Sequence, residues 1–419
     1  MGKVTLFWFR RDLRVFDNRG LYEALKHSNK VLPIFIFDEK ILDKLPKKDA
    51  RITFLLKALW GINKAMKGNK CAVGIYRGAP KAIFKKLTND YEIDKVIANH
   101  DYEPYALERD GEIKELLGDK GIDFITYKDQ VIFEKDEICK NDGKPYLVYT
   151  PYSKKWIANL KPQDTNHYPS ENHLGNLYND SSLPTLTIAD LGFESSEKEP
   201  LPHAFTDEVI DNYEATRNFP MLDSTSRLGA HLRFGTVSVR QLVEKAALVK
   251  EITFLKELIW REFFMQILWH FPHTKDSNFK SKYDRIEWRN DEEEFEKWCA
   301  GETGYPFVDA GMRELNETGF MHNRVRMLVG SFLCKHLLID WRWGEAYFAE
   351  KLLDYEMSSN VGNWQWVAGC GVDAAPYFRI FNPTEQIKKF DKELKYIQKW
   401  VPNFQELDYP QPIVDHKFA

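Results

Sequence analysis

Apolar runs of strand length alternate with segments of helical periodicity through the first third of the chain. The apolar runs, which are rich in β-branched and aromatic residues, lie at 3–9, 30–37, 72–76, 94–98 and 121–126. The helical segments between them lie at 19–28, 50–67, 79–88 and 104–119. Such alternation predicts βαβ units and a parallel, Rossmann-like sheet that is covered by helices on both faces.

The pattern changes near residue 128 and again near residue 206. Residues 128–205 are rich in Pro, Asn, Ser, Asp and Gly and show little periodicity, which is typical of a long connector. Beyond them helical periodicity is nearly continuous, at 206–217, 237–248, 252–270, 293–299, 306–317, 322–338, 343–353, 362–368 and 385–399. We therefore expect an α/β domain at 1–127, a connector at 128–205 and an all-α domain at 206–419.

Composition and charge narrow the class of protein. The chain has 419 residues, enough for two domains, and no uncharged apolar run approaches the ~20 residues that a membrane span needs. The five cysteines lack zinc-site spacing and the N-terminus lacks a secretory pattern, so we expect a soluble cytoplasmic protein with reduced thiols. The net charge of −4 argues against a chain wrapped by nucleic acid but is compatible with a local basic groove.

Tryptophan is the unusual component of this sequence. The chain has 12 tryptophans, and residues 340–382 combine several of them with small residues and isolated polar groups. Polar groups within an apolar run are costly to bury unless they meet a partner, so this stretch indicates a planar, polar ligand such as a flavin ring. Trp364 and Trp366 lie two residues apart, so on a helix one ring would face the interior and the other a cavity.

Taken alone, the individual motifs also have structural explanations. Glu257, Trp260, Arg261 and Phe264 follow helical spacing, as in an amphipathic helix with one ion pair. A Thr-Ser pair such as that at 225–226 is more often a helix N-cap than an anion site. No dinucleotide-binding or phosphate-loop glycine motif follows the first apolar run, which disfavours an ordinary nucleotide-binding fold.

Five longer motifs together carry a specific resemblance. They are FRRDLRVFDN at 9–18, TSRLG at 225–229, ELIWREFF at 257–264, GETGYPFVDAGMRELNETGFMHNRVRM at 301–327 and NWQWVAGCGVDAAPYFRIFNPTEQ at 363–386. The chain resembles the photolyase/cryptochrome family, and within it most closely the class I cyclobutane pyrimidine dimer photolyases. The resemblance covers nearly all of 210–404, where it matches the FAD-binding domain.

The resemblance implies a carbon–carbon lyase that repairs DNA. In such an enzyme blue light excites reduced FAD, one electron passes to the cyclobutane pyrimidine dimer, the two ring bonds split, and the electron returns. The implied partner is UV-damaged DNA from which the dimer is flipped out of the stack. No membrane or obligate protein partner is expected, and the protein is expected to be a monomer.

The resemblance also assigns residues to the cofactor. The positions that match the family's FAD contacts are Tyr213, Thr225, Ser226, Arg227, Leu228, Gly229, Arg261, Asn323, Arg326, Asp354, Glu356 and Asn360. The amide of Asn360 would face the flavin N5, and Arg326 would pair with Asp354. Two positions depart from the pattern, because relatives often have serine at Gly229 and aspartate at Glu356. These departures put one phosphate contact and one flavin-ring contact in doubt.

Other matched positions would contact DNA or carry electrons. The substrate and DNA positions are Arg217, Glu257, Trp260, Asn323, Arg324, Met327, Trp366, Arg379 and Gln386, with the Lys388–Lys389 pair as further candidates for phosphate contacts. Glu257 would hydrogen-bond a carbonyl of the dimer, and Trp260 would pack on it. Trp288, Trp341 and Trp364 match a three-tryptophan electron relay from the surface to the flavin. Scattered tryptophans are otherwise more often core residues.

A second chromophore and two other functions stay open at this point. The segment 99–110 resembles relatives with a deazaflavin or flavin antenna more than those with methenyltetrahydrofolate, and Arg10, Asp101 and Glu103 would line that pocket; a purely structural cleft is the alternative. A cryptochrome-type photoreceptor is the main alternative function. It is disfavoured because the dimer-contact residues are retained and no long tail follows VDHKFA. A (6-4) photolyase normally has paired histidines where this chain has His322 and Asn323.

Overall fold

The computed structural model describes residues 3–66, 71–178, 180, 182–376, 378–402 and 404, and it divides into two compact units. Unit 1 comprises Met1–Glu137, Trp156–Glu199 and Gly229–Leu248; unit 2 comprises Ile138–Lys155, Pro200–Leu228 and Val249–Ala419. Residues 229–248, which the sequence assigns to the helical domain, therefore cluster with unit 1. The contiguous domain boundaries expected from the sequence remain a prediction.

Unit 1 contains the predicted parallel sheet. Its strands are β1 (Val4–Phe9), β2 (Val31–Phe37), β3 (Gly74–Arg77), β4 (Ile93–Asn99) and β5 (Asp123–Tyr127), in the order β3-β2-β1-β4-β5. Every residue of β1 and β2 is buried, as expected for central strands with both faces covered. The prediction of five parallel strands separated by helices is confirmed.

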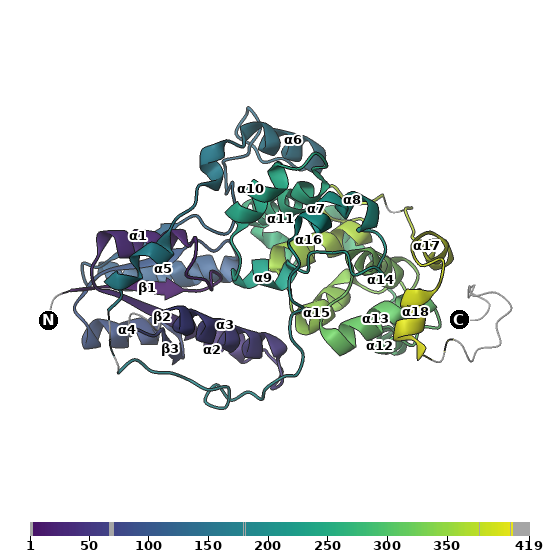
Figure 1. The fold of residues 1–419 in the computed structure, drawn as a ribbon. Helices are drawn as coiled ribbons and strands as arrows, with labels where there is room; N and C mark the ends of the chain where they lie inside the picture. The colour runs from purple at the N-terminus through teal and green to yellow at the C-terminus, as the bar shows by residue number, and fades with distance from the viewer. Residues whose placement is uncertain are drawn as a thin grey trace. The chain divides into compact units, whose positions relative to one another are not determined.

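Figure 1 shows the strands of unit 1 with helices packed around them. Alternate side chains of β1 explain how these helices cover the sheet. Phe7 and Phe9 belong to a core with α1 (Arg19–His27) and α3 (Ala50–Met66). Leu6 and Trp8 belong to a second core with α4 (Pro80–Asp90) and α5 (Pro104–Gly118). The period of two along a strand therefore separates the two apolar layers. The short helix α2 (Glu39–Leu42) follows β2.

Unit 1 also contains two helices from later in the chain, and buried charges hold the second of them. They are α9 (Gly229–Phe234) and α10 (Val239–Ala247). The Arg240 guanidinium of α10 donates to the Asp17 carboxylate at 3.1 Å and to the Asp129 carboxylate at 2.9 Å. Burial alone raises the pKa of Asp129, but Arg14 and Arg240 outweigh it and lower that pKa to about 2. The ionised pair therefore fixes α10 within unit 1.

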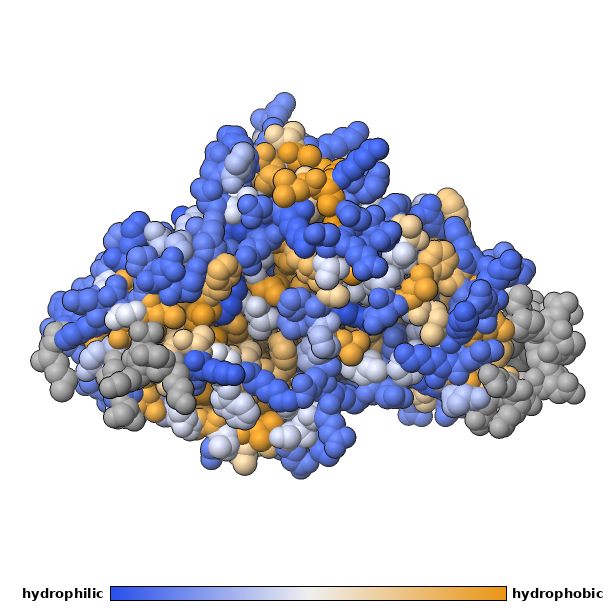
Figure 2. Space-filling view, viewed as in Figure 1, coloured by the Kyte–Doolittle hydropathy of each residue, from blue (hydrophilic) through white to orange (hydrophobic). Residues whose placement is uncertain are grey.

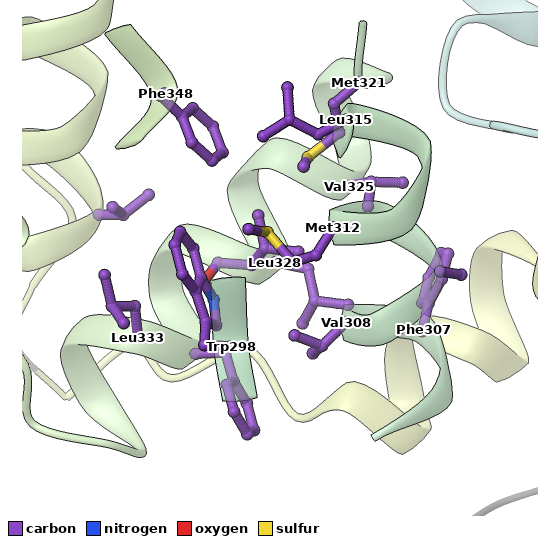
Figure 3. Close-up of a cluster of buried hydrophobic side chains, with 14 of the residues drawn as sticks. Trp298, Phe307, Val308, Met312, Leu315, Met321, Val325, Leu328, Leu333 and Phe348 are labelled. Atoms are coloured by element: carbon purple, nitrogen blue, oxygen red, sulfur yellow. The ribbon is translucent and has the colours of Figure 1, made fainter. Parts of the chain in front are cut away.

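Unit 2 is helical, as predicted. Its helices are α7 (Asp207–Asp211), α8 (Tyr213–Thr216), α11 (Thr253–His270), α12 (Glu292–Ala300), α13 (Pro306–Thr318), α14 (Asn323–Lys335), α15 (Trp341–Lys351), α16 (Met357–Ala368), α17 (Pro383–Phe390) and α18 (Lys395–Trp400). Figure 3 shows part of its core, in which Trp298 of α12 lies among apolar side chains that include Met312, Leu328 and Phe348. The indole N–H of Trp298 donates to the Val329 carbonyl at 3.2 Å, so even this buried polar group has a partner.

Two predicted helices are broken in the structure. The helix expected at 206–217 is α7 followed by α8, because the chain leaves regular helix geometry at Asn212. The helix expected at 385–399 is α17 followed by α18, because Leu394 has a left-handed φ of 56°. The Asp391 carboxylate accepts from the N–H groups of Tyr396 and Ile397, at 3.0 Å each, and starts the new helix.

The segment expected to be a connector contains regular structure that the prediction missed. It includes α6 (Tyr149–Asn159) and the 3-10 helices at Pro162–Thr165 and Ser170–Asn176. Two more 3-10 helices, Pro272–Lys275 and Ser281–Arg285, follow α11. Among the described residues no helix has the length and apolarity needed to cross a membrane. On the face shown in Figure 2, hydrophilic side chains predominate and apolar ones form separate patches.

Candidate functional site

Unit 2 encloses a cavity of about 380 Å³, which is within the range of small-molecule and cofactor sites. Its walls come from the segments around α11, α14 and α16 and from the chain between α15 and α16. The lining residues are Arg217, Glu257, Trp260, Arg261, Phe264, Asn323, Arg326, Met327, Gly330, Phe348, Leu352, Asp354, Tyr355, Glu356, Ser359, Asn360, Asn363, Trp364, Trp366 and Val367. The cavity therefore combines aromatic faces with amides, carboxylates and guanidinium groups.

The stripe Glu257, Trp260, Arg261 and Phe264 lies along the cavity, as its helical spacing on α11 indicates. Arg217, at the C-terminus of α8, forms an ion pair with Glu257. Both side chains are about one-third exposed, at 28% and 33%, so the pair lies at a partly open part of the wall. A carboxylate and a guanidinium are thus available together to a ligand that enters the cavity.

The two tryptophans of α16 differ in environment, although both contribute to the cavity wall. Trp364 is buried, and its ring meets Phe348 edge-on at 5.0 Å and Trp298 at 6.2 Å between centroids. Trp366 is only partly buried. The expectation that one ring faces the interior and the other a cavity therefore describes a difference of degree, because the cavity reaches part of each ring.

The orientation of the Asn360 amide is determined by Glu345 of α15. The amide nitrogen of Asn360 donates to the Glu345 carbonyl at 3.2 Å and to its carboxylate at 3.0 Å. Both amide hydrogens are thereby used, which leaves the amide oxygen as the group that can accept a hydrogen bond from a ligand. Burial raises the pKa of Glu345, although the hydrogen bonds from Asn360 and Tyr355 oppose this.

Charged groups also meet between α15 and α16. Arg326 donates to both oxygens of Asp354, at 3.1 and 2.9 Å, and to the Met321 carbonyl at 2.7 Å. Glu356 is buried and accepts from the Ser358 hydroxyl at 2.8 Å. The glutamate in the place of an expected aspartate therefore has a partner within its own helix. Its side chain still contributes to the cavity wall.

The start of α14 brings His322, Asn323, Arg324 and Met327 to the same region. His322 is buried, and its Nδ1 accepts from the Arg324 N–H at 3.2 Å, so His322 is the N-cap of α14. Burial, together with nearby arginines, lowers the pKa of His322 to about 3. The Arg324 guanidinium lies over the Phe390 ring at 4.3 Å. Asn323 and Met327 line the cavity, whereas His322 supports the helix end.

The loop at 225–229 is not among the residues that line the cavity. Arg227 has a left-handed φ of 55°, lies over the Phe320 ring at 4.2 Å and pairs with Asp223 at 3.0 Å. Leu228 is buried, and the Ser226 carbonyl accepts from the Ala204 N–H at 2.9 Å. The hydroxyl of the preceding residue, Ser224, is buried without a hydrogen-bond partner among the described residues. A buried hydroxyl of this kind needs a hydrogen-bond partner from water or from a ligand.

Several matched residues lie outside the cavity. Trp341 is buried and donates from its indole N–H to Asn278 at 2.9 Å, and Trp288 packs partly buried against the same core. Tyr213 meets Phe254 edge-on at 5.1 Å. Arg379 is exposed and Gln386 is half-buried on α17. The cavity therefore unites the FAD and dimer positions of α11, α14 and α16 but not the more distant ones.

The residues proposed for an antenna lie in a dense ionic cluster of unit 1. Arg10 pairs with Asp110, whereas Asp101 and Glu103 both pair with Arg11, at 3.3 and 3.2 Å. Glu103 also pairs with Arg233 at 2.6 Å. Burial raises the pKa of Asp101, but the surrounding arginines outweigh it and hold that pKa well below its usual range. These side chains already have partners within the protein.

Sequence reasoning missed some of the cavity residues. Glu345, Tyr355, Ser359 and Asn363 contact Asn360 or line the cavity, but none was assigned a role; Asn363 opens the motif at 363–386, and the other three lie outside the five motifs. On α16, Asn363 lies three residues after Asn360 and three before Trp366, and Ser359 lies four residues before Asn363. Helical spacing from Asn360 and Trp366 was therefore the available signal. Glu345 is on another helix, and no periodicity connects it to Asn360.

Comparisons with known proteins agree along the whole chain. Residues 5–170 match the family described as DNA photolyase, and residues 254–415 match the FAD binding domain of DNA photolyase. A deoxyribodipyrimidine photo-lyase of Halobacterium salinarum is 35% identical, over 99% of this chain and 96% of its own.

Solved structures give the same result. A class III photolyase from Agrobacterium tumefaciens has a TM-score of 0.88 and 32% identity, and covers 100% of this chain and 95% of its own. An archaeal photolyase from Sulfolobus tokodaii, solved with two FAD molecules, has a TM-score of 0.79 and 32% identity over 98% and 96% of the two chains. The class I assignment within the family remains a prediction. The chain therefore belongs to the photolyase/cryptochrome family.

Proposed function

We propose that this protein is a light-dependent deoxyribodipyrimidine photo-lyase that splits cyclobutane pyrimidine dimers in DNA. Full-length relatives of that name at about 35% identity support this function. The observation that carries the proposal is the cavity of unit 2. Its lining includes the matched residues Glu257, Trp260, Asn360 and Trp366. No nucleophile or general base is needed for this reaction.

The residues around the cavity fit FAD. Aromatic rings and apolar side chains suit a flat ring system, and the Asn360 oxygen and the Arg326–Asp354 pair suit its polar edge. The matched residues Thr225 and Ser226 would contact the phosphate portion, and the neighbouring Ser224 hydroxyl, which has no hydrogen-bond partner among the described residues, is a further candidate. When bound, reduced FAD supplies the electron that opens the dimer after blue light is absorbed.

The remaining chemistry is binding and orientation by side chains. Glu257 would hydrogen-bond a carbonyl of the dimer, and its ion pair with Arg217 keeps the side chain in place. Trp260 and Trp366 provide apolar walls that exclude water from a dimer that is flipped out of the stack. Arg324, Arg379, Gln386 and the Lys388–Lys389 pair would contact the DNA backbone.

Three finer assignments belong to the same proposal. Trp364, Trp341 and Trp288 would relay electrons from the surface, which their burial in one apolar core supports. An antenna chromophore would bind in unit 1, as the two FAD molecules of the Sulfolobus tokodaii relative suggest for that protein. The protein would act in the cytoplasm as a monomer.

A lesion-specificity assay tests the proposal. Purified protein loaded with reduced FAD is illuminated with oligonucleotides that carry either a cyclobutane dimer or a (6-4) photoproduct. We expect intact thymines to reappear only from the cyclobutane dimer. Repair of the (6-4) product alone would contradict the assignment of lesion. No repair of either, together with a light-dependent change of oligomeric state, would support a cryptochrome-type photoreceptor instead.

A further inference from the structure

We propose that Tyr149, the first residue of α6, is a positioning residue that fixes the ring plane of Trp260 and thereby sharpens recognition of the dimer. This inference rests on the proposed function. Tyr149 comes from the segment that sequence reasoning treated as a connector. It has no part in the motifs that carried the family resemblance.

The contact between the two rings is unusually complete. Their centroids are 3.5 Å apart and their planes differ by 5°, so the rings are stacked face to face. Phe263 meets Tyr149 and Trp260 edge-on, at 5.9 and 5.6 Å. Phe264 also stacks with Trp260, at 5.5 Å between centroids and 26° between planes. Tyr149 covers one face of the indole, so Trp260 offers to the cavity the part of its ring that these two neighbours leave uncovered.

Tyr149 is itself held at both ends. Its hydroxyl donates to the Lys256 carbonyl at 2.7 Å, one turn before Trp260 on α11. Its backbone N–H donates to the Asp373 carboxylate at 3.0 Å. Burial raises the pKa of Tyr149, so the hydroxyl remains a donor throughout the physiological range. The ring therefore has little freedom to turn or slide.

Asp373 connects this support to the second indole of the cavity. Asp373 has a left-handed φ of 47° in the turn that follows α16. Two residues later, the Ala375 N–H donates to the Trp366 carbonyl at 3.2 Å. Trp260 and Trp366 are thus linked through Tyr149 and Asp373. A pair of walls that is already ordered loses less conformational entropy when a flat ligand binds between or beside them.

The test compares three variants of the FAD-loaded protein. Tyr149→Phe keeps the stacked ring and loses only the hydroxyl; Tyr149→Leu removes the stacked ring. Tyr152→Leu is the matched control, because Tyr152 is also a buried tyrosine of α6 and meets Phe263 at 5.2 Å, whereas the ring stacked on Trp260 at 3.5 Å is that of Tyr149. The affinity of each protein is measured for dimer-bearing and for undamaged DNA of the same sequence.

We expect Tyr149→Leu to weaken binding of dimer-bearing DNA by about tenfold, the upper part of the range for one aromatic pair, with binding of undamaged DNA unchanged. Tyr149→Phe and Tyr152→Leu should retain the wild-type ratio within about twofold, because both variants keep an aromatic ring stacked on Trp260. An unchanged ratio in Tyr149→Leu, or an equal loss in Tyr152→Leu, would overturn the proposal.

A second readout separates this inference from the proposed function. Near-ultraviolet circular dichroism of the DNA-free protein reports the stacked rings directly. We expect Tyr149→Leu and Trp260→Phe to remove the same aromatic signal. If the wild-type protein does not prefer dimer-bearing DNA, the proposed function fails, whereas the spectrum still decides the stacking role. Different spectral changes in the two variants would reject that role as well.

Discussion

At the scale of single residues, the polarity of the cavity is set by partners that the motifs do not contain. Asn360 is recognisable in the sequence, but the direction of its amide depends on Glu345. His322 is similarly visible within MHNRVRM, although its role as a buried, neutral N-cap appears only in the structure. Side-chain types could therefore be predicted from the sequence, whereas their hydrogen-bonded orientation could not, since it depends on helices distant along the chain.

The amide orientation predicts an effect on bound FAD. Glu345→Met removes the carboxylate that fixes Asn360, so the amide can turn and the hydrogen bond to a ligand N–H weakens by about 1 kcal/mol. Reduced flavin carries the additional N–H, so its stabilisation should decrease and the midpoint potential of bound FAD should fall. A redox titration measures this. Glu345→Gln can still accept from Asn360 and should lie closer to the wild type; equal potentials in all three proteins would contradict the account.

His322 predicts a pH dependence of stability. The unfolded chain takes up a proton near pH 6.5, whereas the native histidine does so only near pH 3. Stability that is present above pH 6.5 is therefore lost as the pH falls, by about 2 kcal/mol between pH 6.5 and 5. Denaturant unfolding at both pH values measures the loss. His322→Asn keeps an N-cap and should remove this part of the loss; identical pH dependence in both proteins would refute it.

At the scale of elements, periodicity located almost every helix and strand but not where two of them break. The helical apolar pattern continues through Asn212 and Leu394, but the helices do not. Asn212 ends α7 and caps α8, and Leu394 has a left-handed φ, so the backbone at each residue leaves the regular helix. The helix α6 was missed for another reason. Its buried residues Tyr149, Tyr152 and Trp156 do follow helical spacing, but Pro151 and the many polar and turn-forming residues of the segment favoured a connector.

The close packing of α15 on α16 can be tested at one glycine. A Cβ at Gly344 would lie 2.6 Å from the Leu333 side chain and closer still to the Trp364 ring. Gly344→Ala should therefore cost about 1–3 kcal/mol, as overpacked cores do, and displace Trp364. Thermal unfolding and FAD retention measure the effect.

The matched control for this change is Gly111→Ala in α5. A Cβ at Gly111 meets no atom within 4 Å. The same substitution in the interior of a helix should there stabilise the protein by up to about 1 kcal/mol, because alanine is the better helix former. If both variants shift the unfolding temperature in the same direction, the proposed packing of Trp364 against Gly344 is wrong.

At the scale of the whole molecule, the sequence motifs identify the family and the cavity residues, whereas the chain's division into units requires the fold. Residues 229–248 have the helical periodicity of unit 2 but belong to unit 1, where Arg240 pairs with Asp17 and Asp129 and Phe234 packs in the apolar core. Charged residues so far apart in sequence carry no periodic signal that would reveal their pairing. The matched motifs, in contrast, lie on the helices that surround one cavity.

The buried pairing of Arg240 with Asp17 and Asp129 predicts a large effect of one substitution in unit 1. Arg240→Met leaves two buried carboxylates with fewer partners and should destabilise the protein by about 3–5 kcal/mol. A second change, Asp129→Asn, should recover part of that loss. Denaturant unfolding compares these variants with Arg285→Met, at an exposed arginine. A loss in Arg240→Met no larger than in Arg285→Met would show that the buried pair is not essential.

The proposed function requires that the dimer is split in the cavity of unit 2. Asn363 lines the cavity and is exposed, so Asn363→Trp should narrow its entrance, whereas Leu248→Trp changes a residue that is 83% exposed outside unit 2. The decisive measurement is the rate of dimer splitting under blue light by both variants and the wild type, each with its FAD content determined. Repair by the wild type and Leu248→Trp but not by FAD-loaded Asn363→Trp is the predicted result. Equal repair by all three proteins, or repair by none, would contradict the claim.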